Sequence, residues 1–194
     1  MEDEISSILE HHGVMTLATL RSDGWPQATT VSYVSRGLIL YFLISRTSQK
    51  FKNITADDRV SIAIASEPKA AADIRGLSMS ARTLESRDEP YRSEMLARLG
   101  ERHPGYFDAK TLDMTESALI RALPKVISII DYSKGLGHSE IVTVGAEEAL
   151  EFTANRPDDW GPNPESASPS LVVRKAPMTV GGSTSWLAAH ARSE

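Results

Sequence analysis

The sequence contains no cysteine, and this absence excludes several kinds of site at once. Without a thiol, the chain can form no disulfide, thiolate metal site, iron–sulfur cluster or cysteine nucleophile. Long apolar runs are missing as well, since no segment reaches the roughly 20 apolar residues that a membrane-spanning helix needs. We therefore expect neither thiol chemistry nor a membrane partner.

Positive charge is also in short supply. Lysine and arginine number 21 against 26 aspartate and glutamate residues, so the formal net charge is −5. General nucleic-acid binders need surplus cations to displace counterions from the phosphate backbone, so nucleic acid is not an expected partner. A local basic patch can still hold one small anion. The opening segment MEDEISSILE is acidic and has no apolar run like that of a signal peptide, which predicts a cytoplasmic location.

Short strand signals separated by turn residues dominate the first three quarters of the sequence. Strands are predicted at residues 14–20, 27–35, 38–44, 59–65, 72–86 and 124–133, the first three forming an antiparallel meander. Asp23-Gly24 with the following Pro26 is typical of a tight turn. Gly76 inside the fifth strand indicates a bulge or a close backbone approach.

Helical periodicity occurs in four places. Helices are predicted at residues 3–13, 48–57, 90–103 and 113–123. With the strands, they predict a mainly β fold: a six-stranded antiparallel split β-barrel with flanking helices. We expect the barrel to occupy residues 1–145. Proline, aspartate, asparagine and serine accumulate later, so residues 146–194 are predicted to form an irregular or partly disordered extension.

The segment SRTSQKFKNI, residues 45–54, is the main candidate for a binding site. A helix N-terminus offers unpaired N–H groups and the positive end of the peptide dipole, which suits a phosphate. Ser48 brings a hydroxyl, Gln49 an amide and Lys50 a charge, and Arg46 is placed to add a forked contact. The alternative is an ordinary helix start capped by Thr47 or Ser48. The helix is expected to fray where Asn53 and Thr55 stand near its end.

Several motifs in order resemble the pyridoxamine 5′-phosphate oxidase-like family of flavin-binding split barrels. The motifs are TLAT at 16–19, DGWPQATTVSYV at 23–34, SQKFKNI at 48–54, DDRVSIAI at 57–64 and PKVISIIDYSKGLGHSEIVTV at 124–144. The resemblance covers roughly residues 8–144. It implies a homodimer that binds FMN between its subunits, and it leaves F420 or haem as other cofactors.

The resemblance also implies where the cofactor lies. The second strand would follow the flavin ring, and the end of the third strand would follow the ribityl chain. The residues implied are Thr29, Thr30, Val31 and Ser32 for the ring, Ile44 and Ser45 for the ribityl chain, and Ser48, Gln49 and Lys50 for the phosphate. Gln49 stands where the family usually has arginine, and Arg46 is the candidate to compensate. Arg75 is implied near the ring, where a cation would stabilise reduced flavin.

Pyridoxamine phosphate is not the expected substrate, because Val34 stands where the true oxidases carry a lysine and the tail lacks their tryptophan and arginine pattern. The leading hypothesis is an FMN-dependent oxidoreductase that transfers hydride at flavin N5 between a nicotinamide or other donor and a small molecule. No catalytic side chain is assigned. The alternatives are a non-catalytic flavin- or haem-binding or sensing protein, an F420-dependent reductase, and an interaction module without cofactor.

Histidines and tryptophans give weaker signals. His11 and His12 are adjacent, so on a helix they point about 100° apart, which disfavours one shared metal. His138, in the predicted loop GLGHSE, either lines a pocket or lies on the surface, and no metal site is predicted. Trp25 follows the turn glycine and is predicted to pack in the core or an interface rather than against a flavin ring.

Overall fold

The computed structural model describes residues 2–65, 67–106 and 112–144, so the predicted extension at 146–194 lies outside the described residues. The helices are α1 (Glu2–His11), α2 (Gln49–Ala56) and α3 (Tyr91–Arg102). The strands are β1 (Val14–Leu20), β2 (Pro26–Ser32), β3 (Val34–Arg36), β4 (Ile39–Ser45), β5 (Arg59–Ala65), β6 (Arg75–Glu85), β7 (Ser117–Asp131) and β8 (Ser139–Thr143). Within the described ranges, no helix is long and apolar enough to cross a bilayer.

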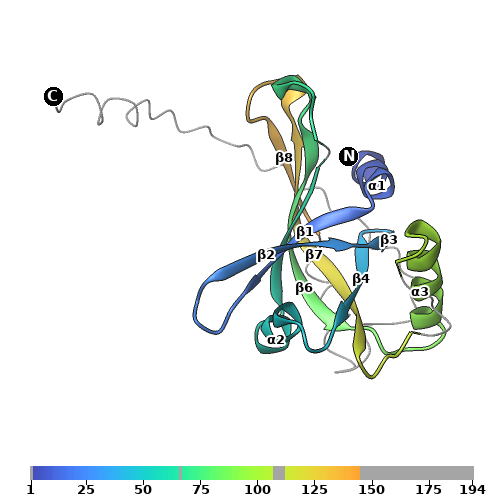
Figure 1. Ribbon diagram of the computed structural model, residues 1–194. Helices are drawn as coiled ribbons and strands as arrows, with labels where there is room; N and C mark the ends of the chain where they lie inside the picture. Colours follow the sequence, from blue (N-terminus) through green and yellow to red (C-terminus); the bar gives the residue numbers. More distant parts are fainter. Residues whose placement is uncertain (1, 66, 107–111, 145–194) are drawn as a thin grey trace.

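All the strands belong to one antiparallel sheet. Its order is β2-β1-β5-β6-β7-β4-β3, and β8 pairs with β7. Figure 1 shows the sheet curling around the core, with α3 against one side and the β1–β2 hairpin projecting away from the body. The predicted fold class is therefore confirmed. The described sheet has eight strands rather than six, because the predicted second strand is divided and β8 adds to β7.

Two apolar clusters hold the sheet together. The larger lies inside the curled sheet, where strands such as β5 bury every second residue: Val60, Ile62 and Ile64. Helix α1 closes this cluster with Ile5 and Leu9, as its apolar face predicts. The second cluster lies between α3 and strands β3, β4 and β7. Strand β4 contributes side chains to both clusters, which explains why its sequence is apolar throughout.

The helix predicted at residues 113–123 is wrong, because β7 begins at Ser117. Its residues alternate between the two clusters: Ala118 and Ile120 enter the larger one, while Leu119 and Leu123 face α3. This period of two is hidden in the sequence because both faces are buried. Leucine and alanine, which favour helices, occupy the strand for that reason.

The single strand predicted at residues 27–35 is also corrected, because the chain changes partner at Tyr33. The Tyr33 side chain is fully buried, its hydroxyl donates to the carbonyl oxygen of Leu9 at 3.0 Å, and its backbone N–H donates to the carbonyl oxygen of Gly13 at 3.1 Å. Before this residue, β2 pairs with β1, and after it β3 pairs with β4. The first three predicted strands therefore form two hairpins rather than one meander.

The close approach predicted at Gly76 is confirmed. A Cβ atom at this position would lie 2.4 Å from the carbonyl oxygen of Ile64 and 2.9 Å from the Cβ of Ala65. Strands β5 and β6 pair here, with Ala65 opposite Gly76. Only a residue without a side chain lets the two strands meet at this end of the sheet.

Replacing Gly76 by alanine should lower the free energy of unfolding by about 1–3 kcal/mol, because the added methyl group must displace backbone atoms of β5. Urea titration followed by circular dichroism measures this change. Gly100→Ala in α3 is the matched control, since its Cβ meets nothing within 4 Å and alanine favours a helix. Equal stability of the two variants would contradict the close packing at Gly76.

Candidate functional site

The site is centred on the start of α2, which follows β4 after one turn. Ser48 is the N-cap: its Oγ accepts from the N–H of Phe51 at 3.2 Å and donates to the carbonyl oxygen of Ser45 at 2.6 Å. The prediction of a capped helix start is thus confirmed for Ser48. The first intrahelical hydrogen bond runs from the N–H of Lys52 to the carbonyl oxygen of Ser48. The N–H groups of Gln49 and Lys50 therefore have no acceptor within the helix and are open to an outside anion.

Lys50 provides the charge at this helix start. Its side chain is half-buried, and burial lowers the pKa of its ammonium group below the ordinary value. Among the described residues, Lys50 has no carboxylate partner, and the first turn of α2 contains no acidic residue. A partly desolvated ammonium group beside the positive end of a helix attracts an anion.

Asn53 fixes α2 against the sheet, although the sequence pattern indicated only a fraying helix end. It is 3% exposed, and its Nδ2 donates to Thr19 Oγ1 of β1 at 2.9 Å and to Gln27 Oε1 of β2 at 3.1 Å. Its Oδ1 accepts from Gln49 Nε2 at 2.8 Å. One buried amide therefore connects the first turn of α2 with β1 and β2. The prediction of fraying at Asn53 is wrong.

Arg46 lies beside the helix start, but three of its five N–H donors are already engaged. Its Nη1 donates to Glu85 Oε2 at 3.3 Å, its Nη2 donates to Glu85 Oε1, and its Nε donates to the carbonyl oxygen of Met114 at 3.2 Å. The guanidinium also lies 5.4 Å from the centre of the Phe51 ring. Arg46 thus joins the β4–α2 turn to β6 and to the segment before β7.

The predicted ring and ribityl residues lie on two strands close to α2. Thr29, Thr30, Val31 and Ser32 belong to β2, an edge strand that pairs only with β1 among the described strands. The hydroxyl of Thr29 is buried and has no hydrogen-bond partner among the described residues. At the end of β4, Ile44 is buried and Ser45 is exposed. Asn53 ties α2 to Gln27 of β2, so the helix start and this edge strand are neighbouring elements.

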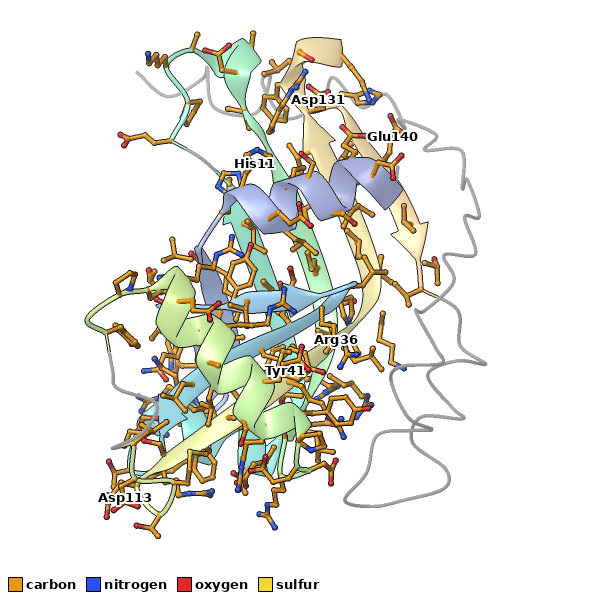
Figure 2. All side chains as sticks on the ribbon, turned by 90° about the vertical axis from the view of Figure 1, so that its right-hand side faces the viewer. His11, Arg36, Tyr41, Asp113, Asp131 and Glu140 are labelled. Carbon is orange, nitrogen blue, oxygen red and sulfur yellow. The ribbon has the colours of Figure 1, made fainter. Side chains whose placement is uncertain are left out.

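Arg75 lies at the other end of the sheet. Its Nε donates to Asp131 Oδ1 at 3.2 Å, whereas Arg46 bonds to Glu85 at the opposite end of β6. Ten residue steps along β6, at about 3.3 Å each, span roughly 30 Å. Figure 2 shows Asp131 and Asp113 at opposite ends of the molecule, and Met114, the neighbour of Asp113 in the sequence, contacts Arg46. Within one protomer, Arg75 and Lys50 do not meet.

The remaining sequence candidates lie elsewhere. His11 is on the surface of α1, where its Nδ1 lies 2.6 Å from the carbonyl oxygen of Ser7, and His138 lies 3.4 Å from Glu140 in the loop before β8. In the described ranges, no group of three or more histidine, cysteine, aspartate or glutamate residues is placed to hold a metal. Trp25 is 72% exposed at the tip of the β1–β2 hairpin, so packing in the core of its own chain is excluded.

These features define a class of protein: an antiparallel split barrel with an electropositive helix start beside an edge strand. The sequence pattern of the pyridoxamine 5′-phosphate oxidase family matches residues 1–129, which is more than half of the chain. The chain belongs to this family, and the resemblance seen in its motifs is confirmed. None of the curated protein sequences matches the chain.

Solved structures share the fold. A conserved hypothetical protein from Mycobacterium tuberculosis is 23% identical with a TM-score of 0.61, over 77% of this chain and 94% of that one. HutZ, the heme storage protein of Vibrio cholerae, is 23% identical with a TM-score of 0.55, over 63% and 89%. An F420 reductase is 24% identical with a TM-score of 0.51, over 63% and 94%. At these identities the similarity concerns the fold.

Asn53→Ala should lower the free energy of unfolding by about 1–3 kcal/mol, because it leaves the buried hydroxyl of Thr19 and the amide of Gln27 without their partner. Urea denaturation of the purified variant measures the effect. Lys52→Ala, at an exposed position of the same helix, is the control and should change stability by less than about 0.5 kcal/mol. Similar values for the two variants would mean that Asn53 does not anchor α2.

Proposed function

We propose that this protein is a redox protein that binds a flavin-type cofactor, with its phosphate at the start of α2, and transfers hydride between a nicotinamide or other donor and a small molecule. FMN is the simplest such cofactor, and F420 is the alternative suggested by the similarity to an F420 reductase. The observation that carries the proposal is Lys50. Its ammonium group is half-buried at a helix start and has no carboxylate partner in the described part of the chain.

The residues present fit such a group. The N–H groups of Gln49 and Lys50, together with the Lys50 ammonium, would bind the phosphate. Ile44 and Ser45 would flank the ribityl chain. The unpartnered hydroxyl of Thr29 would donate to the polar edge of the ring.

The ring edge would also meet the backbone of β2, from Thr30 to Ser32, because the outer side of this edge strand is unpaired within the described chain. Arg46 and Ser48 would act by positioning α2 rather than by contacting the phosphate directly. When bound, the flavin supplies hydride transfer, and the protein supplies binding, orientation and exclusion of water.

A second copy of the chain is part of the proposal. One face of the sheet has a patch of uncharged and mostly small side chains across six strands, and Arg59 and Arg82 lie on the same face at one end of the patch. This uncharged sheet face consists of Val14, Thr16, Ala18, Ala28, Thr30, Ser32, Ser61, Ala63, Ala65, Gly76, Ser78, Ser80, Val126, Ser128, Ile130, Ser139, Ile141 and Thr143. A twofold interface places a patch against its own copy, so charges of one sign would repel each other. This face meets that requirement, and small side chains allow close packing.

The homodimer also explains how Arg75 could take part. It lies roughly 30 Å along β6 from the Arg46–Glu85 pair, too far to share one phosphate with Lys50 in the same protomer. We propose that any contact between Arg75 and the ring comes from the second copy. The site would then be complete only in the dimer.

Haem is the weaker alternative, despite the similarity to a heme storage protein. The described histidines are at the end of α1 and just after it, just after α3, and in the loop before β8. None of them belongs to β2, β4 or α2, so the proposed site offers no imidazole ligand among the described residues. A bound flavin that no nicotinamide or F420 donor reduces would favour storage or sensing over catalysis.

Lys50→Ala should weaken flavin binding by about 1.5–3 kcal/mol, because a charge-assisted contact to the phosphate is lost. The fold should be preserved, since Lys50 has no ion-pair partner among the described residues. Titration of cofactor-free protein with FMN, followed by quenching of flavin fluorescence, gives the dissociation constant. Lys52→Ala is the control. An unchanged affinity for Lys50→Ala would place the phosphate elsewhere, and failure of FMN, FAD and F420 alike to bind would refute the proposed function.

Ala63→Arg should dissociate the homodimer, because it places a charge against its own copy near the middle of the uncharged sheet face. Ala63 is exposed within one protomer, so the fold should tolerate the larger side chain. Analytical ultracentrifugation measures the mass, and cofactor affinity should fall with dimer content. Thr55→Arg, at an exposed position of α2, adds the same charge as a control. A dimer that survives Ala63→Arg must use another face.

A further inference from the structure

The α2 site has less positive charge available than a terminal phosphate carries. Lys50 is the cation at the first turn of the helix that has no acidic partner in the described part of the chain. The N-terminus of a helix adds the equivalent of about +0.5 charge. A phosphate monoester carries about −1.5 to −2 charge at pH 7, because its second pKa is about 6.

Arg46 does not close this gap, because its charge is paired with the carboxylate of Glu85 and each of its three nitrogens already donates one hydrogen bond. Two of them bond to the carboxylate of Glu85, and the third donates to the carbonyl oxygen of Met114. Burial acts to raise the pKa of Glu85, but hydrogen bonds from Arg46 and Arg87 hold that pKa below its ordinary value. Glu85 is therefore ionised at neutral pH and retains Arg46.

The neutral donors at the helix start are also partly committed. The Gln49 amide donates to Asn53, and the Ser48 hydroxyl donates to the carbonyl oxygen of Ser45. What is left for an anion is the backbone N–H groups of Gln49 and Lys50 and the Lys50 ammonium. A second negative charge in this partly desolvated site would lack a cation, which is costly.

We propose that the α2 site selects a phosphate that is substituted on both sides and carries one negative charge, in preference to the terminal phosphate of a mononucleotide. This inference rests on the proposed function, because it concerns the same site. Two kinds of cofactor offer such a phosphate. The phosphodiester of F420 has one charge in all, whereas the pyrophosphate of a flavin dinucleotide has one charge on each phosphorus and fits with its second phosphate outside the site.

The test is a set of binding titrations on cofactor-free, full-length protein with riboflavin, FMN, FAD and F420 at pH 5.5 and pH 7.5. Between these values the FMN phosphate loses its second proton, whereas the charges on the doubly substituted phosphates stay constant. The affinity for FMN relative to the better of FAD and F420 should fall about fivefold or more as the pH rises. Using this ratio removes the effect of protein groups that titrate in the same range.

Two variants restore positive charge by different routes. Gln49→Arg adds a guanidinium at an exposed position of the first turn, and Glu85→Gln removes the charge that retains Arg46. Each variant should raise the affinity for FMN at pH 7.5 by about tenfold, which is the effect of one charge-assisted contact. The increase for FMN should be larger than the increase for FAD or F420. Thr55→Arg adds the same charge away from the helix start and should leave the ratio unchanged.

The outcomes separate the two proposals. The proposed selectivity would be overturned if the unmodified protein preferred FMN at pH 7.5. It would also be overturned if the affinity for FMN relative to the better of FAD and F420 did not change with pH. Either result would leave a flavin site in place. Failure of all four ligands to bind, or equal binding of riboflavin and the phosphorylated forms, would overturn the proposed function itself. If the selectivity holds, whichever of FAD and F420 binds with the higher affinity is the cofactor type that supplies the phosphate.

Discussion

The structure of the candidate site depends on one buried amide. Asn53 is a residue of α2, and its side chain forms hydrogen bonds with Thr19 on β1, with Gln27 on β2 and with Gln49 in the first turn of the same helix. An eight-residue helix has little stability of its own, so its orientation must come from such contacts. The same amide keeps the helix start beside the edge strand β2. A site made from a helix start and a strand edge can exist only while these two elements are held together.

Much of the fold could be predicted from local patterns, and the failures have a common cause. Alternating residues in β5, the apolar face of α1 and the turn at Asp23-Gly24 depend on nearby residues, and each was predicted from the sequence. The first half of β7 was mistaken for a helix, because burial on both faces removes the alternation that marks a strand. The partner change at Tyr33 depends on contacts with Leu9 and Gly13, which no local pattern reveals.

The candidate site shows the same division. The cap at Ser48 is a local feature, and the sequence was sufficient to predict it. The roles of Asn53 and Arg46 were not predictable, because their partners are far away in the sequence: Gln27 for the amide, and Glu85 for the guanidinium. A cation that looks available in the sequence can be neutralised by a carboxylate 39 residues later. The sequence therefore indicates where the site lies, but it does not indicate how much net charge the site carries.

The charge balance of the site bears on the kind of assembly that would complete it. Within one protomer, Lys50 is the half-buried cation at the start of α2 that has no carboxylate partner in the described residues, while Arg75 lies at the distant end of β6 beside Asp131. A cofactor much shorter than β6 cannot touch both groups of one chain. The uncharged sheet face offers a way for a second copy to approach without repulsion, because its small side chains carry no charge from β2 across to β8. In a symmetric pair, each copy's α2 could then face groups from the far end of the other copy's sheet. In the proposed dimer, the fold that keeps Arg75 away from α2 of its own chain would thus bring Arg75 to the site of the second copy.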